Sequence, residues 1–302
     1  MKRLPQIALL PDGKRLHLQD GPIDLIIEAK GRDADVSAAY RAAADRFTGL
    51  LDELCMELAE LRSAARPDHC ALMGVVARRM HAAVAPFAAD CFITPMAAVA
   101  GSVAEEILHA MLQAAALERA YVNNGGDIAL HLGVGEQFTV GLMDRPDRHG
   151  VMHTISVDAE MPVRGIATSG RHGRSFSLGI ADAVTVLART ASQADAAATV
   201  IANAVDLPGH PAILRVPASE LQPDSDLGVR LVTRDVGALG EHEIEQALEA
   251  GVAQARMLLT SGLIEGAALR LLGETRIVGA TGLAAPASHA FQGPTINNML
   301  QA

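Results

Sequence analysis

Three short segments of the sequence combine residue types that could bind a ligand. The first is NNGGD at 123–127, in which Gly125 and Gly126 let another group approach the main chain and Asp127 could hold a hydroxyl or a cation. Asn-Gly and Gly-Gly are also leading dipeptides of tight hairpin turns, and the spacing alone favours that plainer interpretation. The segment is therefore either a turn or a place where the backbone contacts a ligand.

A second polar segment, ATSGRHGRSFS at 167–177, gathers hydroxyl groups, glycines and basic side chains, including Arg174, in a protein whose formal net charge is −10. Such a loop can offer backbone N–H groups and guanidinium groups to a phosphate, although a solvated hairpin tip has a similar composition. No G-x-x-x-x-G-K motif supports the phosphate interpretation. The residues that we predict to line a ligand site here are Thr168, Ser169, Gly170, Arg171 and His172, together with Asp182 farther along the chain.

The third segment is ASQADAAATVIAN, in which Asp195 and Thr199 are four residues apart. On a helix this spacing places the carboxylate and the hydroxyl on one face, where they could bind a hard cation such as Mg²⁺. The spacing of Ser192 and Asp195 also fits a helix-starting cap, and by itself it favours the cap.

The composition argues against several classes of function. The chain has 302 residues, 50% of them hydrophobic, and 35 acidic residues outnumber 25 basic ones. An acidic chain with no tryptophan and few other aromatic residues offers little to nucleic acid or to an anionic membrane. No apolar run reaches the roughly 18 residues of a membrane span, and prolines interrupt the start of the chain before a signal-peptide core develops, so we expect a cytoplasmic protein. Cys55, Cys70 and Cys91 are predicted to be reduced core residues.

The elements that must position these segments follow from periodicity and turn signals. Residues 4–30 predict a small antiparallel sheet, and apolar spacing predicts long helices over about 34–64 and 69–84 and from Pro95 onward. Beyond residue 120, strands and turns predominate, with helices expected at 190–205 and 241–259. Because helices and strands fall into blocks, we predict an α+β fold with mainly antiparallel sheets, forming one domain over 1–282, with a loosely ordered tail at 283–302.

In this order, the segments resemble the motifs of the ApbE superfamily of flavin transferases. In that family an alanine- and glycine-rich helix leads to a VN-x-GGD-I strand, a TSG strand end, an SVTVIA strand and a helix carrying D-A-x-x-T. The corresponding segments are PMAAVAGSVAEEIL, VNNGGDI (122–128), ATSG (167–170), DAVTVLA (182–188) and ADAAAT (194–199). The whole chain looks most like a compact cytosolic branch of uncharacterised proteins in that superfamily.

The resemblance implies a duplicated, T-fold-related α+β unit with a ligand bound between its halves. It implies that GGD lies beside a pocket for a flavin nucleotide, FAD or FMN, and that Asp195 and Thr199 bind Mg²⁺. The transferases also carry an H-x-x-D-P-x-T-G segment, for which this chain has no counterpart.

Two hypotheses remain open. The first is a cytosolic protein that binds a phosphate-bearing ligand, as a flavin or another nucleotide would be, and acts on it or on a small substrate nearby. The second is a non-catalytic accessory protein that supports a metabolic partner enzyme. The Ala-rich helices offer flat surfaces that would suit a homodimer.

Overall fold

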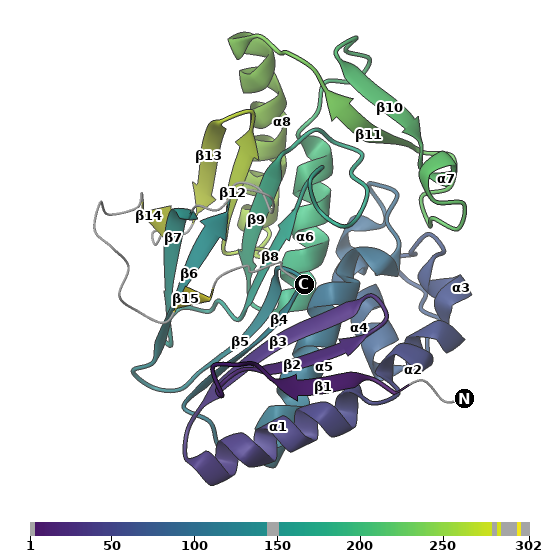
Figure 1. Ribbon diagram of the computed structural model, residues 1–302. Helices are drawn as coiled ribbons and strands as arrows, with labels where there is room; N and C mark the ends of the chain where they lie inside the picture. Colours follow the sequence, from purple (N-terminus) through teal and green to yellow (C-terminus); the bar gives the residue numbers. More distant parts are fainter. Residues whose placement is uncertain (1–3, 144–150, 280–282, 285–294, 297–302) are drawn as a thin grey trace. The chain divides into compact units, whose positions relative to one another are not determined.

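The computed structural model describes residues 4–143, 151–279, 283–284 and 295–296 (Figure 1). They group into two compact units, each of which is described by itself. The first unit comprises Met1–Gln137, Asp158–Ile166 and Arg189–Gln193, and the second comprises Phe138–Val157, Ala167–Ala188 and Ala194–Ala302.

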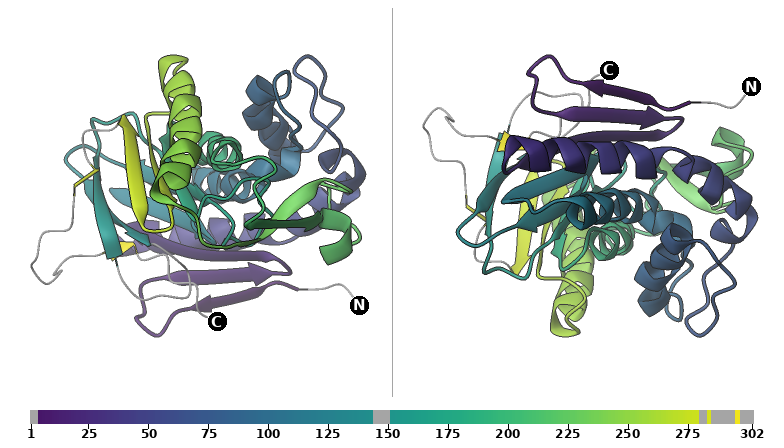
Figure 2. Two further views of the ribbon diagram at one scale, coloured as in Figure 1. Left: turned by 90° about the horizontal axis from the view of Figure 1, so that it is seen from above. Right: turned by 90° about the horizontal axis from the view of Figure 1, so that it is seen from below.

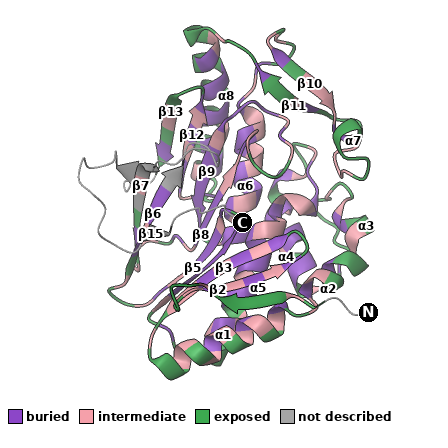
Figure 3. Ribbon diagram, in the orientation of Figure 1, coloured by how far each residue is buried: buried purple, intermediate pink, exposed green. Residues whose placement is uncertain are grey.

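Five consecutive antiparallel strands form the sheet of the first unit. They are β1 (Gln6–Leu9), β2 (Leu16–Asp20), β3 (Ile23–Lys30), β4 (Arg119–Asn124) and β5 (Asp127–Leu132), and each pairs with the next. Alternate residues of β2 and β3 are buried, as expected for a sheet with one face on the core, whereas β1 is exposed along its whole length (Figure 3). The antiparallel sheet predicted for residues 4–30 is confirmed.

Helices cover one face of this sheet. Helix α5 packs on β4 and β5, and α1 packs beside α5 (Figure 2). The buried core between sheet and helices is aliphatic and includes Leu25, Ile27, Phe47, Met80 and Ile107. The helical elements of this unit are α1 (Asp33–Phe47), α2 (Leu50–Met56), α3 (Leu58–Leu61), α4 (Val75–Val84), the 3₁₀ turns η1 (Ala85–Phe87) and η2 (Pro95–Ala98), and α5 (Val99–Ala114).

The long helix predicted for 34–64 is wrong in one respect, because the chain forms three shorter helices there. Gly49 has φ of 89°, a left-handed conformation that an α-helix cannot contain, and a second break follows at Glu57. The apolar spacing was nevertheless informative, since Phe47, Leu50 and Leu54 are all buried. The second predicted helix begins at Val75 rather than at 69. The third begins at Pro95 only as a 3₁₀ turn, and its α-helical part starts at Val99.

The second unit is built mainly from antiparallel strands and two long helices. The end of β8 is followed in one sheet by β9, β12 and β13, and α8 packs on β12 and β13. A separate hairpin pairs β10 with β11, and a third sheet has the order β14-β7-β6-β15. Its elements, of which β6, β8 and α6 begin and β7 ends in the first unit, are β6 (Gln137–Met143), β7 (Val151–Asp158), β8 (Gly165–Ser169), β9 (Ala183–Ala188), α6 (Ala191–Ala204), β10 (Ile213–Pro217), α7 (Ala218–Leu221), β11 (Leu231–Val236), α8 (Glu241–Thr260), β12 (Gly266–Leu271), β13 (Glu274–Gly279), β14 (Leu283–Ala284) and β15 (Thr295–Ile296).

The α+β fold with mainly antiparallel sheets is confirmed, since β1 to β5 pair antiparallel in succession and β12 pairs antiparallel with both β9 and β13, whereas β15 and β6 form a parallel pair. The tail predicted at 283–302 lies largely outside the described residues. Within the described part of the chain, no helix is both long and apolar enough to cross a membrane. The cysteine prediction is wrong about burial, because Cys55, Cys70 and Cys91 are free thiols at exposed positions.

Candidate functional site

The loop that follows β8 is held by the buried carboxylate of Asp182. Arg171 donates to Oδ1 of Asp182 from Nε at 2.8 Å and lies within 2.6 Å of it through Nη2. Nε2 of His172 lies 3.3 Å from the same oxygen, and the backbone N–H of Leu272 donates to Oδ2 at 2.5 Å. Three residues that the sequence predicted to share a site, Arg171, His172 and Asp182, are therefore in one cluster.

Gly170 lets this loop pass close to the strand that begins after Asp182. A Cβ built at Gly170 would lie 2.5 Å from the carbonyl oxygen of Asp182, and the glycine has φ of 155°, so a larger residue would displace the backbone. The N–H of Arg171 donates to the carbonyl of Ala181 at 2.9 Å, and the N–H of Gly173 donates to the carbonyl of Gly170 at 3.0 Å. The start of the loop is thus fixed by backbone and side-chain bonds together.

The two arginines of the loop have different environments. The Arg171 side chain is only 12% exposed and is paired with Asp182, so its charge is largely neutralised. Arg174 is exposed, and among the described residues no side chain or carbonyl accepts a hydrogen bond from its guanidinium. Of the hydroxyl groups predicted here, that of Thr168 is 2.9 Å from the hydroxyl of Thr185, while Ser169 lies at the end of β8. Arg174 is therefore the basic group of the loop that is available to an anion.

The NNGGD segment forms a two-residue hairpin turn. Gly125 and Gly126 connect β4 to β5 with φ of 65° and 116°, and Asn124 pairs with Asp127 across the turn. The buried Asn123 accepts the N–H of Gly126 at Oδ1, 2.8 Å away, and Nδ2 of Asn124 donates to the carbonyl of Ala100 at 3.1 Å. Both asparagines therefore have structural partners that favour the turn interpretation. The turn belongs to the first unit and the Asp182 cluster to the second.

Asp195 and Thr199 lie one turn apart in α6, and both are half-buried. The cap predicted from Ser192 and Asp195 is wrong, because α6 begins one residue before Ser192. Oγ1 of Thr190 accepts the N–H of Gln193 at 3.3 Å, which is the bond of an N-cap residue. Among the described residues, no three or more His, Cys, Asp and Glu side chains come together in a group that could hold a metal ion.

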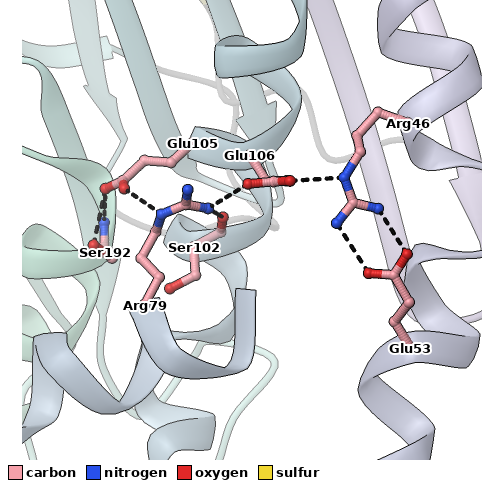
Figure 4. Close-up of polar contacts among 7 residues, drawn as sticks. All are labelled: Arg46, Glu53, Arg79, Ser102, Glu105, Glu106 and Ser192. Carbon is pink, nitrogen blue, oxygen red and sulfur yellow. Dashed lines mark hydrogen bonds and ion pairs between the residues drawn. The ribbon is translucent and has the colours of Figure 1, made fainter. Parts of the chain in front are cut away.

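A charged network in the first unit was not found from the sequence (Figure 4). Glu106 binds Nε of Arg46 at 2.7 Å and Nη1 of Arg79 at 3.0 Å, and Arg46 also makes a bidentate pair with Glu53. Burial alone would raise the pKa of Glu106, but the hydrogen bonds and positive charges of the two arginines lower that pKa below its ordinary value. The network thus keeps a largely buried carboxylate ionised.

The same network fixes the start of α6 against α5. Arg79 lies 3.2 Å from Glu105, and Glu105 accepts both the N–H and the hydroxyl of Ser192, at 2.7 and 2.9 Å (Figure 4). A Cβ at Gly101 would lie 2.3 Å from the carbonyl oxygen of Ala191, so the two helices can approach only because Gly101 has no side chain. The glycine and the paired glutamates of AGSVAEE are the sequence signal of this contact, but their partners come from other helices.

The chain is similar to one family model and to several curated proteins. The model of a family described as AbpE bacteria matches residues 7–277. A UPF0280 protein of Methanopyrus kandleri is 42% identical over 129 residues, 42% of this chain and 48% of the relative. A UPF0280 protein of Methanobrevibacter smithii is 36% identical over 158 residues, 50% of this chain and 64% of the relative. The chain spans about half the length of the curated relatives that it matches.

Proposed function

Because the chain belongs to the AbpE bacteria family, we propose that it is an ApbE-like protein that binds a phosphate-bearing ligand of the flavin or nucleotide class. The loop at 167–177 would hold the phosphate, and Mg²⁺ would bind together with the ligand. A link to the ApbE flavin transferases and the predicted cytoplasmic location are parts of this proposal.

The observation that carries the proposal is that one arginine of the loop is buried in an ion pair and the other is exposed. Arg171 and Asp182 form a buried pair that fixes the loop, so ordering the loop adds little cost to ligand binding. Arg174 is exposed beyond that fixed point, and its backbone N–H and that of Ser175 donate to no acceptor among the described residues. A guanidinium next to unbonded amides is a donor set that suits phosphate oxygens.

The residues present suit Mg²⁺ only in combination with a ligand. Asp195 and Thr199 supply one carboxylate and one hydroxyl, and no group of three or more acidic, His or Cys ligands gathers in the described chain. Mg²⁺ is commonly bound through one or two carboxylates together with substrate phosphates and water. When bound, the ion would neutralise phosphate charge, and Asp195 would orient it. We therefore expect the metal to bind with the ligand rather than before it.

Flavin transfer to a protein is not part of the proposal, because the H-x-x-D-P-x-T-G segment of the transferases has no counterpart in this sequence. Binding with an unassigned activity is the narrower proposal. The fixed loop with its exposed Arg174 favours it over a purely accessory role, in which the loop would have no need of an available cation.

The first experiment identifies what copurifies with the full chain, by its absorbance and mass spectrum, and then measures thermal stability with FMN, FAD and adenine nucleotides. A ligand present at 100 times its Kd stabilises the folded state by about 2.7 kcal/mol, which is easily measured. We expect stabilisation by at least one of these nucleotides and loss of that effect in Arg174→Gln. Arg234 is an exposed arginine of the same unit, and Arg234→Gln is the matched control. Equal stabilisation of wild type and Arg174→Gln would contradict the role of the loop.

A further inference from the structure

The first unit contains a small polar pocket that neither the ApbE resemblance nor the proposed function uses. Its volume is about 100 Å³. This is room for several water-sized groups, since a cavity of roughly 10–15 Å³ on this measure already holds one water. The polar side chains that line it belong to Glu60, Ser63, Arg66, His69 and His81. All of them lie between the end of α2 and the middle of α4, within one unit.

The loop that lines the pocket is anchored on both sides. Arg66 and His69 form an isolated antiparallel bridge, and the N–H of Ala65 donates to the carbonyl of Ile93 at 2.8 Å. Leu72, which closes the loop, is 3% exposed and belongs to the core. The backbone of the loop is therefore fixed to the fold, while Glu60, Ser63, Arg66 and His69 are themselves exposed to solvent.

His81, which is among the residues that line the pocket, has a buried ring nitrogen without a partner in the described residues. This residue of α4 is only 9% exposed, and its buried Nε2 has no hydrogen-bond partner within the described part of the chain. A buried nitrogen without a partner destabilises the protein unless a bound molecule supplies one. His81 is also one of the residues that line the pocket, so a molecule bound there lies beside this side chain.

The charges around the pocket favour an oxyanion. Arg66 is exposed and its guanidinium makes no ion pair or hydrogen bond with the described residues, so it is an available cation next to the two imidazoles. A metal ion is not favoured, since Glu60, His69 and His81 are not among groups of residues close enough together to hold one. Arginine and histidine donors around a small space are typical of sites for phosphate or carboxylate oxygens.

Glu60 and Ser63 add acceptors to the same wall. The Ser63 hydroxyl donates to the carbonyl of Ala59 at 2.9 Å, so towards the pocket its oxygen can only accept. The carboxylate of Glu60 also accepts. An anion that carries its own O–H group satisfies these acceptors, whereas a fully deprotonated anion of the same size is repelled by Glu60.

We propose that this pocket is a binding site for a small protonated oxyanion of the phosphate type, held by Arg66 and His69, with His81 in the pocket wall, and selected by Glu60. The site is separate from the loop at 167–177 and does not depend on the proposed function.

The test is a calorimetric titration of the full chain with inorganic phosphate and with sulfate. It is carried out in an Arg174→Gln background, so that phosphate bound at the loop does not contribute. Failure of the pocket proposal is then distinguishable from failure of the proposal for the loop at 167–177. We expect phosphate to bind more tightly than sulfate, since sulfate has no O–H group at neutral pH. Arg66→Gln should weaken phosphate binding about tenfold or more, the loss typical of removing one charged donor.

Two further variants make the test specific. Glu60→Gln should improve sulfate binding and so remove the preference for phosphate. If Glu60 did not select between the two anions, this variant would leave the preference unchanged. Arg78 is an exposed arginine of α4 that does not line the pocket, and Arg78→Gln should leave both titrations unchanged. Absence of phosphate binding would mean that the pocket holds only water, and binding that Arg66→Gln leaves unaltered would place the anion elsewhere. Either result overturns the proposal, and neither depends on whether a variant at the buried His81 folds.

Discussion

The guanidinium of Arg171 binds the carboxylate of Asp182 through two nitrogens, at 2.6 and 2.8 Å from Oδ1, and both side chains are close to fully buried. Breaking a buried ion pair by removing one partner typically costs about 3–5 kcal/mol, and the Leu272 N–H that remains on Asp182 puts our expectation at the low end of that range. We therefore expect Arg171→Ala to lower the free energy of unfolding by roughly 3 kcal/mol. Urea denaturation measures this, with Arg174→Gln as the control that should change stability by less than about 0.5 kcal/mol. A similar small effect for both arginines would mean that the pair does not hold the loop.

Glu106 should make the stability of the protein depend on acid pH. Its pKa is lowered in the folded state, net of burial, by Arg46 and Arg79. A carboxyl group with a lowered folded-state pKa contributes stability above its unfolded pKa and loses that contribution as pH falls through the folded value. We expect Glu106→Gln to cost about 1.5–3 kcal/mol at neutral pH, the range for hydrogen bonds to charged groups. The difference from wild type should shrink as pH falls below the ordinary value of 4.5.

Glu53 provides the control for this prediction. Its side chain is 53% exposed although it pairs with the same Arg46, and exposed ion pairs contribute about 0–1 kcal/mol. Glu53→Gln should therefore have a small effect that changes little with pH. A difference between Glu106→Gln and wild type that stays constant from neutral pH to pH values well below 4.5 would contradict the pKa argument.

Gly101 should tolerate no side chain. A methyl group there would meet the carbonyl oxygen of Ala191 at 2.3 Å, so α5 and the start of α6 would have to separate. We expect Gly101→Ala to destabilise by at least about 1–3 kcal/mol, as overpacking does, although alanine favours a helix. Gly31→Ala is a fair control, because a Cβ there finds its nearest atom at an ordinary 3.5 Å. A thermal melt in which Gly101→Ala is as stable as wild type would show that the helices do not make this contact.

Thr190 and Asp195 should separate the cap from the ligand role. Because Thr190 accepts the N–H of Gln193, Thr190→Ala should cost about 1 kcal/mol, the usual value for an N-cap, without regard to metal or ligand. Asp195 lies beyond the first turn of α6, which begins at Ala191. We expect Asp195→Asn to lower the Mg²⁺-dependent affinity for the ligand, with Thr199→Val giving a smaller loss. Denaturation and calorimetry of the three variants check this. A loss of stability in Asp195→Asn with unchanged binding would remove the metal from the account.

The sequence predicted what depends on local pattern and missed what depends on residues far apart in the chain. Apolar spacing identified Phe47 and Leu54 as buried, but the positive φ of Gly49 became visible only in three dimensions. Cys55 was expected in the core because its neighbours are apolar. It is exposed because adjacent helical residues point about 100° apart, so that Leu54 faces the core and Cys55 does not.

In the candidate site, too, the sequence predicted what is local and missed what depends on distant residues. The loop composition at 167–177 drew attention to both arginines, yet nothing local distinguishes the buried Arg171 from the exposed Arg174, since the difference arises from Asp182. The network of Arg46, Arg79 and Glu106 joins three separate helices, and no spacing rule within one helix could have brought those side chains together.

The most direct test of the proposed function is a calorimetric titration of FMN, with Mg²⁺ present, into wild type, Arg174→Gln and Arg234→Gln. Removing one charge-assisted donor to a phosphate should weaken binding by about tenfold or more. We therefore expect wild type and Arg234→Gln to bind FMN with equal affinity and Arg174→Gln to bind it at least that much more weakly. Two results would contradict the proposal that the loop at 167–177 holds the phosphate of a nucleotide. One is equal FMN affinity in all three proteins. The other is that wild type binds none of FMN, FAD and the adenine nucleotides.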